Sequence, residues 1–329
     1  MKRPLLFASV AVFLLFFNSC VIFQAARAVQ GIQEALTAES DFGLAAGALP
    51  TLIKVQEGLL AASPEDQGTI VGTAQLYIMY GNAFVQGPAQ DLPSSQYEKK
   101  RSEDLRARNL YRRAFVLLEP ALNRKAAGIV ETFRKGQIEK EGLPAGAKAM
   151  LARFGKADVA MMYWSAASIL AAFSIDPLDM RESSIVSLAK AFLDRGLELY
   201  PAYDNGTLQD LAVSVYGSFP PELGGDKAKA EAAFRKGMEI TGGRTPGLYV
   251  TYAATICVPN DDYAGFKKNL DLALAIDPEA NPRSRLMTLI TQNNARRMLA
   301  QAEDYFLSVP GDDVPGNDVP GEEVPPANQ

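Results

Sequence analysis

Three stretches of this sequence end alike: Gly196-Leu-Glu-Leu-Tyr-Pro201, Gly237-Met-Glu-Ile-Thr-Gly242 and Ala273-Leu-Ala-Ile-Asp-Pro278. In each, a small residue is followed by an apolar one, and a proline or glycine stands five positions after the small residue. A small residue lets the helix close against its neighbour, and the proline or glycine then ends the helix. The recurrence indicates paired helices that stack as structural repeats.

These endings resemble those of the tetratricopeptide repeat (TPR), whose second helix closes on a run of this type. Small and large apolar residues at helical spacing support four such pairs. They are Tyr77, Tyr80, Gly81 and Phe84 with Ala107, Tyr111 and Ala114; Trp164, Ala167, Ser168 and Ala171 with Ala189, Leu193 and Gly196; Leu208, Leu211, Ala212 and Val215 with Ala230, Phe234 and Gly237; Val250, Ala253, Ala254 and Cys257 with Phe266, Leu270 and Ala273. The regular repeat length is lost, so a helical bundle with coincidental small residues stays open as the alternative.

The rest of the body is also helical in pattern, with no alternation typical of strands. Residues 24–62 read as another helix pair, residues 121–155 as an extra helical excursion, and residues 283–307 as a capping helix over the last apolar face. We therefore expect an all-α fold, an α-solenoid or superhelix of TPR-like antiparallel helix pairs with extra N- and C-terminal helices.

The N-terminus reads as a lipoprotein signal peptide. Lys2 and Arg3 precede the apolar run from Leu5 to Phe17, which is too short for a comfortable membrane span and ends at Asn18-Ser19-Cys20. We expect a signal peptide over residues 1–19 and lipidation of Cys20, with stable membrane anchoring by two or more acyl chains. Phe17 and Asn18 depart from the usual lipobox, and an ordinary secretory signal or an uncleaved anchor would also export the body.

The C-terminal residues differ in composition from the predicted helical repeats. After the repeat domain, predicted over residues 20–308, a five-residue Val-Pro-Gly motif recurs through residues 309–329. Proline and glycine oppose regular structure and the acidic residues oppose collapse, so we expect a disordered acidic tail.

Composition excludes several functions. The chain has no histidine, which removes serine–histidine, cysteine–histidine and histidine–zinc chemistry. Much of the net charge of −5 belongs to the tail, so the body is near neutral and lacks the basic excess that nucleic-acid binding needs. Cys257 lies in an apolar stretch and reads as a core residue. No phosphate-binding loop, nucleophile elbow or calcium loop is present. We expect no enzyme activity, no metal and no cofactor.

The first helices of a solenoid line its concave surface, where ligands and partners usually bind. The repeat register predicts the following inward-facing residues as a ligand or partner surface: Ile78, Asn82, Met161, Ser165, Gln209, Val213, Tyr216, Thr251 and Thr255. Most are apolar or neutral, which suits a hydrophobic or amphipathic ligand with a few hydrogen-bond anchors. A register error of one or two residues would turn several of these faces outward.

Nearly the whole mature chain resembles the T-component family associated with TRAP transporters. The resemblance is carried by the lipoprotein leader and by segments that include Leu49-Pro50-Thr-Leu-Ile-Lys54, Leu76-Tyr-Ile-Met-Tyr-Gly-Asn-Ala-Phe84 and Gly224-Gly225-Asp226-Lys227. It implies a periplasmic TPR-like lipoprotein that works beside the solute-binding protein of an importer of organic acids driven by ion gradients. It also implies a homotrimer with cavities that accommodate a ligand, and it supplies no residue signature for the site.

The leading hypothesis is thus an accessory protein that binds a periplasmic TRAP solute-binding protein, with a hydrophobic or organic-acid small molecule as a further ligand. The alternative is an envelope scaffold that assembles proteins without binding solute. A glycan hydrolase on a helical scaffold would need a carboxylate pair across a groove, for which the sequence offers no motif.

Overall fold

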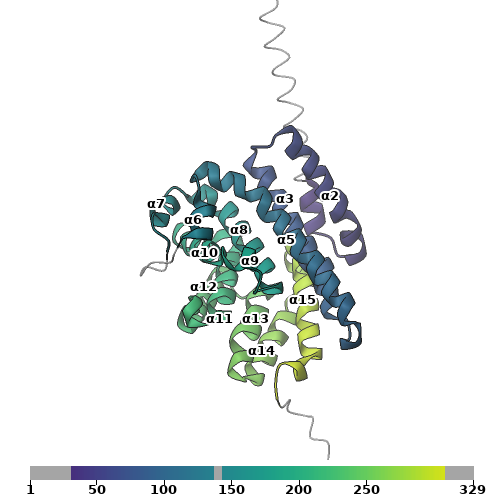
Figure 1. Cartoon of the computed structure of the whole chain (residues 1–329). Coiled ribbons are helices and arrows are strands. Elements are labelled where there is room, and N and C mark those ends of the chain that lie inside the picture. Colours follow the sequence, from purple (N-terminus) through teal and green to yellow (C-terminus); the bar gives the residue numbers. More distant parts are fainter. Residues whose placement is uncertain (1–30, 137–142, 308–329) are drawn as a thin grey trace, which may run out of the picture.

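The fold is built from helices that pack in pairs (Figure 1). The computed structural model describes residues 31–136 and 143–307, and no extended strand occurs in these ranges. The predicted all-α helical-repeat fold is confirmed. The signal peptide, Cys20 and the acidic tail lie outside the described residues, so the boundaries predicted there stay predictions.

The helix pairs follow one another along the chain. They are residues 31–37 with α2 (Phe42–Ala62), α3 (Gln67–Tyr80) with α5 (Tyr97–Lys125), α8 (Val159–Ile175) with α10 (Val186–Leu199), α11 (Thr207–Ser218) with α12 (Lys227–Thr241), and α13 (Pro246–Tyr252) with α14 (Tyr263–Leu274). The excursion contains α6 (Ile129–Lys135) and α7 (Ala147–Leu151), and the capping helix is α15 (Arg285–Ala300).

Aspartate side chains start several of these helices. A carboxylate at the N-cap accepts a hydrogen bond from a backbone N–H that the first turn of a helix leaves unpaired. Among the longer helices, the N-cap carboxylates that do so are those of Asp41, Asp66, Asp226 and Asp262. The local sequence therefore fixes where α2, α3, α12 and α14 begin.

The glycines of the recurring endings are the joints between successive pairs. A β-carbon on Gly237 would lie 2.7 Å from Leu248 Cδ1, and one on Gly196 would lie 3.2 Å from Leu208 Cδ2. Leu208 and Leu248 are both buried in the first helix of the next pair. The same contact thus recurs at two joints, which is what the repeat interpretation of these stretches predicts.

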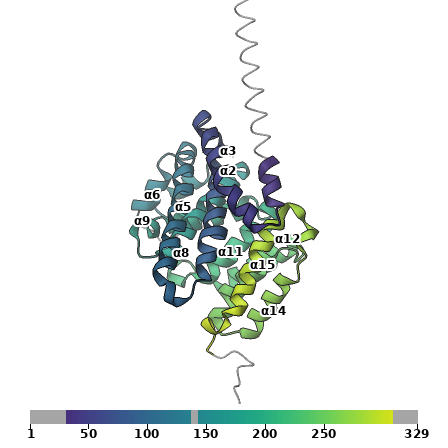
Figure 2. The same ribbon diagram turned by 90° about the vertical axis from the view of Figure 1, so that its right-hand side faces the viewer.

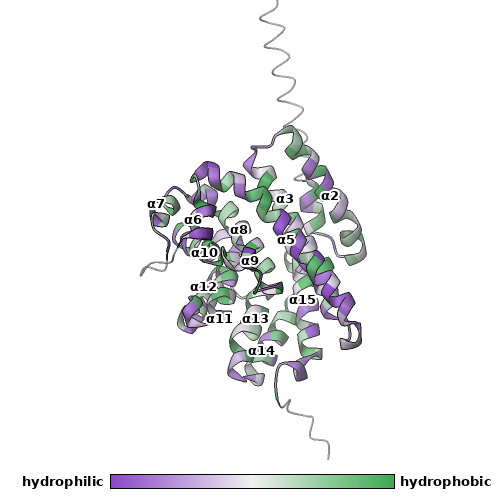
Figure 3. Ribbon diagram, viewed as in Figure 1, coloured by the Kyte–Doolittle hydropathy of each residue, from purple (hydrophilic) through white to green (hydrophobic). Residues whose placement is uncertain are grey.

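Hydrophobic residues occur along the helices (Figure 3), and the buried ones form a core cluster that extends from Leu36 to Leu286. A second buried cluster under α13, α14 and α15 shares Phe234, Met238 and Tyr252 with the main one. By length and composition alone, the helical stretch Lys156–Ile175 could cross a membrane, but half of its apolar window is buried. Its helix, α8, packs against α5 and α10, so we assign it to the core.

The last helix returns to the first ones, which closes the solenoid. Helix α3 continues through the π-helical turn η1 (Gly81–Gln86) into α4 (Gly87–Gln90), and this run ends beside α15 (Figure 2). Arg297 Nη1 donates to Gly87 O over 3.1 Å, and Arg285 Nη1 donates to Ala38 O over 2.9 Å. Both carbonyls lie at helix C-termini, where carbonyl groups lack partners and the helix dipole favours a cation.

Replacing Arg297 with methionine keeps most of the apolar stem and removes the capping hydrogen bond. We expect Arg297→Met to lower the free energy of unfolding by about 1–2 kcal/mol, as expected for a hydrogen bond to a charged group that is partly exposed. Amide exchange should accelerate first in α4 and α15.

Arg296→Met is the matched control, because Arg296 is exposed and, among the described residues, it bonds only to Asn293 on its own helix. Equal effects of the two substitutions on the free energy of unfolding would show that the contact with Gly87 does not hold α15 against α4.

Candidate functional site

The structure distributes the predicted inward-facing residues between the core and the surface. Those on α8 and α11 are buried, and those on the last repeat are accessible. Ile78, Met161, Ser165, Gln209, Val213 and Tyr216 are buried, Thr251 and Thr255 are half-buried, and Asn82 is exposed. Ser165 Oγ donates to Met161 O within α8 over 2.7 Å, and Gln209 Nε2 donates to Pro201 O over 3.0 Å. A ligand or partner role for these nine residues stays a prediction.

The accessible stripe on these helices is displaced by one or two positions from the predicted one. Tyr163, Trp164 and Ala167 are half-buried on α8, and Asp210 and Ser214 are half-buried on α11. Small residues occur on both sides of each first helix, so the sequence pattern alone does not fix which side faces the core. The hydrophobic period of α8 is correspondingly weak, because almost every position is apolar.

Aromatic side chains gather at one end of this stripe. The ring centroids of Tyr163 and Trp164 lie 4.9 Å apart in an edge-on arrangement, and those of Tyr163 and Tyr203 lie 5.8 Å apart. Tyr200 follows at 6.1 Å from Tyr203. All four side chains keep some exposure to solvent. The repeat pattern assigns Trp164 to the core, and only the fold shows that it belongs to a cluster reaching across α8 and η4 (Tyr203–Gly206).

The turn that carries Tyr203 has an unusual backbone. Asp204, Asn205 and Gly206 all have positive φ values, of 43°, 52° and 90°. Aspartate and asparagine tolerate this left-handed region better than most residues, although a run of three is uncommon. Burial raises the pKa of Tyr203 to about 12, and the charge of Asp204 adds to the rise. The turn thus holds a carboxylate beside the aromatic cluster.

Asp210 is the other carboxylate of this region, and it lacks a full set of partners. Its Oδ1 atom is buried and accepts no hydrogen bond. Gly247 on α13 lies directly against it, since a β-carbon there would be 2.6 Å from Oδ2. Burial raises the pKa of Asp210 to about 6, and a hydrogen bond from Thr251 opposes the rise. Its charge also raises the pKa of Tyr163, for which burial is the main cause.

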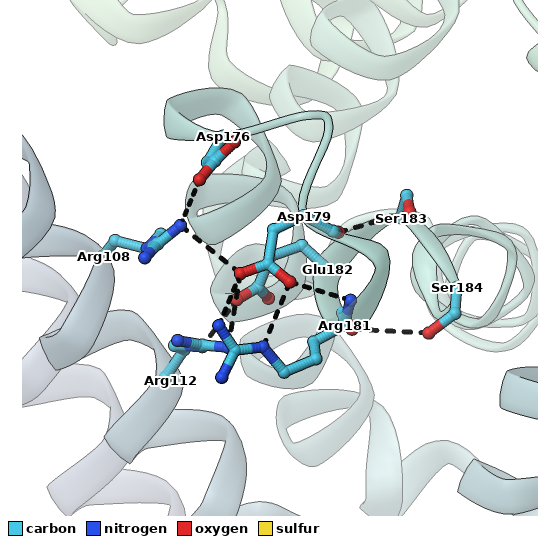
Figure 4. A network of polar contacts seen from close by, with 8 residues as sticks. All are labelled: Arg108, Arg112, Asp176, Asp179, Arg181, Glu182, Ser183 and Ser184. Carbon is cyan, nitrogen blue, oxygen red and sulfur yellow. Dashed lines mark hydrogen bonds and ion pairs between the residues drawn. The ribbon is translucent and has the colours of Figure 1, made fainter.

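A second charged cluster has its carboxylates balanced by arginines (Figure 4). It links α5 to the connection between α8 and α10, and its members are Arg108, Arg112, Asp176, Asp179, Arg181 and Glu182. Arg112 Nε lies 2.6 Å from Glu182 Oε1, and Arg181 holds the pKa of Asp179 far below its ordinary value. Because each carboxylate faces an arginine, this cluster anchors a connection and offers no free charge. Asp210 has no such ion pair within residues 31–136 and 143–307.

The outer side of the solenoid carries a groove of about 1010 Å³. Its floor is α10, and its walls come from the α6–α7 excursion and from η5 (Pro221–Leu223) in the insertion between α11 and α12. Met180 and Leu223 line it and are 76% and 54% exposed. The charged residues on the floor pair with each other, as Lys190 does with Asp194 over 2.8 Å. The α6–α7 excursion and the insertion between α11 and α12 both depart from the repeat pattern. Together they form one groove with an apolar rim.

Comparison with known proteins agrees with this architecture. The sequence matches the family described as "TRAP transporter T-component" over residues 38–306. It is also 34% identical over 271 residues to an uncharacterized protein of Treponema pallidum (strain Nichols), and the similarity covers 82% of each chain. The match to the family begins at the end of the first described helix and ends beyond α15.

Asp210 should make stability depend on pH. Its folded pKa lies above the ordinary value of 3.8, so the folded state holds the proton more tightly than the unfolded chain does. The free energy of unfolding then falls as pH rises from about 4 to about 6, and stays lower above that range. We expect Asp210→Asn, which removes the charge, to stabilise the protein by about 1–3 kcal/mol at pH 8.

Denaturant unfolding at pH 8 and pH 4.5 measures this difference. The gain should shrink at the lower pH, because Asp210 is then mostly protonated. The groups that face the Tyr163–Asp210 pair are Tyr203 and Asp204 from η4 and the neutral Thr251 from α13. A variant less stable than the parent at pH 8 would mean that the carboxylate is compensated.

Proposed function

The chain belongs to the TRAP transporter T-component family, and we propose that it is a lipid-anchored periplasmic protein that binds the solute-binding protein of a TRAP-type importer. Family membership makes it an accessory component of such a transporter and places it in the bacterial envelope. The observation that carries the proposal is the extent of the family match, which spans residues 38–306 and so includes α2 to α15. A match confined to one repeat would support only a generic helical repeat.

The anchor is proposed to be Cys20. The charged and apolar leader and the Ser19-Cys20 pair support this. Acyl chains on Cys20 would hold the solenoid near a membrane and so raise its effective concentration near the permease.

The outer groove is our candidate surface for the solute-binding protein. Its rim exposes Met180 and Leu223, and Leu178, two residues before Met180, is 90% exposed. Exposed large apolar side chains that cluster on a folded surface mark interaction sites. The apolar rim around paired charges resembles the anatomy of protein interfaces, with anchors that can bury in a partner.

The half-buried residues along the first helices of the pairs, which include Tyr163, Trp164, Asp210 and Thr251, form what we call the inner stripe. It is our candidate surface for a small solute. Helix α11 packs against α13, where Thr251 donates a hydrogen bond to Asp210. A mostly apolar lining with a few polar groups suits a hydrophobic or amphipathic solute. A homotrimer, which the family resemblance implies, would have three times the chain mass of 35.5 kDa in light scattering.

Partner binding can be tested with the full chain in detergent and the periplasmic solute-binding protein of a TRAP importer from the same organism. We expect a complex that co-purifies, and we expect Met180→Asp to weaken it at least about tenfold because a charge cannot enter an apolar contact without a large desolvation cost. Leu272→Asp on α14 is the matched control, since Leu272 is 42% exposed and lies outside the groove. Absence of a complex at high micromolar concentrations would overturn the proposed function.

Anchoring has its own test. Cys20→Ser should give a protein without acyl chains, because no thiol would remain at that position to accept a lipid. Mass spectrometry of the N-terminal peptide would confirm or exclude the acyl chains, and an unmodified Cys20 in the parent would contradict the anchor.

A further inference from the structure

We propose that the acidic tail of this chain, residues 309–329, binds to a basic turn at the start of α5, formed by Lys99, Lys100 and Arg101. The tail itself lies outside the described residues, and the binding surface proposed for it lies within them. Both partners belong to this chain, so the contact is independent of the transporter role proposed above.

The basic turn has no counter-charge among the described residues. It is the one run of three consecutive basic residues in the sequence, and Lys99 and Arg101 are exposed. No ion pair within residues 31–136 and 143–307 reaches any of its three side chains. Every pair of adjacent basic residues elsewhere in these ranges has at least one member in an ion pair. The members that pair are Arg112, Lys125, Arg134, Lys135, Lys236, Lys267 and Arg297. The missing counter-charge is therefore particular to the basic turn.

The carboxylates beside the basic turn on α5 are held by other groups. Glu103 Oε2 lies 3.0 Å from Arg106 Nη1, and Asp104 Oδ1 accepts a hydrogen bond from Gln90 Nε2 over 3.4 Å. The charges of the basic turn act on Asp104 without forming an ion pair with it. Glu98 is the only acidic residue in the first turn of α5, where the helix dipole adds partial positive charge. An acidic segment bound at this end of α5 would thus meet unpaired positive charge.

The tail supplies charge of the opposite sign. It contains five acidic side chains and no lysine or arginine. These side chains are those of Asp312, Asp313, Asp318, Glu322 and Glu323. One exposed ion pair contributes little, but several on one tethered segment act together. Tyr97, which is 58% exposed two residues before the basic turn, offers a ring on which the Val-Pro steps of the tail can pack.

The described chain ends beside the segment that leads into α5. Gln301, just after α15, donates from Nε2 to Gln90 O over 3.3 Å. Arg297 Nε lies 3.9 Å from Asp91 Oδ1. The N-terminal end of α5 and the C-terminal end of α15 accordingly lie at the same end of the molecule in both views (Figures 1 and 2). Leu307, the last described residue, is fully exposed there, so the tail departs close to the basic turn.

The tail is long enough to reach the basic turn. Nine residues separate Gln90 from Lys99, and six separate Gln301 from Leu307, which span at most about 30 Å and about 20 Å. Both spans contain helical turns and are therefore shorter. The sixteen residues from Leu307 to Glu323 extend to about 55 Å. Tethering gives an effective concentration in the millimolar range, so a dissociation constant of about 1 mM for the free segment would keep the tail bound for at least half of the time.

Lysine acetylation measures whether the tail covers the basic turn. The full-length protein in detergent is treated with limiting acetic anhydride, and the rates at Lys99 and Lys100 are read by mass spectrometry. At about 10 mM salt, both should react at least about threefold faster when the five tail carboxylates are replaced by amides, because the tail of the parent shields the amines. At about 1 M salt, where the Debye length falls from about 30 Å to about 3 Å, this difference should disappear.

The same samples contain their control. Lys268 on α14 is exposed and has no ion pair among the described residues, so its rate should be equal in the parent and the tail variant. A body variant with Glu198→Gln and Glu239→Gln lowers the negative charge elsewhere, since these side chains are 66% and 65% exposed on α10 and α12. It should leave Lys99 and Lys100 as slow as in the parent. Circular dichroism checks that each variant is folded.

Carbodiimide cross-linking locates the contact, because it joins a carboxylate to an amine only where the two meet. We expect links from the tail to Lys99 or Lys100 within one chain. A mixture of isotope-labelled and unlabelled chains separates these from links between two copies, which would have mixed masses.

Equal acetylation rates at Lys99 and Lys100 in the parent and the tail variant at low salt would overturn the contact. Tail cross-links confined to other lysines would overturn it as well, as would links found only between differently labelled chains. These measurements need no solute-binding protein, so a negative result here beside an intact partner complex would remove only the tail contact. A lost partner complex beside a protected basic turn would remove only the proposed function.

Discussion

Each helix pair can bury its apolar face only against the next pair, and the close joints between pairs make this stacking feasible. Gly196 against Leu208 and Gly237 against Leu248 are two instances of one contact, in which the absence of a β-carbon lets the following helix approach. Because each pair is covered by its neighbours, the first and last pairs each have an apolar face that no further pair covers. The chain meets this need by bringing α15 back to the N-terminal helices.

The contacts that join α15 to the N-terminal helices are polar, whereas the contacts between successive helix pairs are apolar. Arg285 and Arg297 donate to carbonyl groups at the C-termini of N-terminal helices, so the end of one element is satisfied by a side chain more than two hundred residues away. Such bonds are directional and specify which helix meets which, whereas apolar packing tolerates small displacements. The irregular π-helical turn η1 shifts the register of its helix just before the carbonyl that Arg297 reaches.

The buried and half-buried carboxylates of this fold differ in whether they face arginine side chains. The cluster around Asp179 and Glu182 is balanced and holds a connection against α5, which is a structural role. Asp210 on α11 has no ion pair within the described residues, and it accepts a hydrogen bond from Thr251 on α13 while its Oδ1 atom is buried without a partner. Perturbed and uncompensated groups concentrate at functional sites, since a fold that served stability alone would gain by neutralising them. The inner stripe and the outer groove are therefore two separate candidate surfaces, which we propose for a solute and for a partner protein.

The sequence by itself determined the features that depend on neighbours along the chain. Aspartate caps, helix-ending prolines and glycines, and the recurring small residues specified the all-α repeat fold, and family resemblance pointed to the transporter. Only the tertiary structure decided which side of each first helix is accessible, because α8 is apolar or small nearly all round and carries no local signal of orientation. It also decided that Asp210 has no counter-ion in the described part of the chain and that Arg297 joins α15 to α4. Those properties belong to groups brought together from distant parts of the chain, and no periodicity in the sequence encodes their separation.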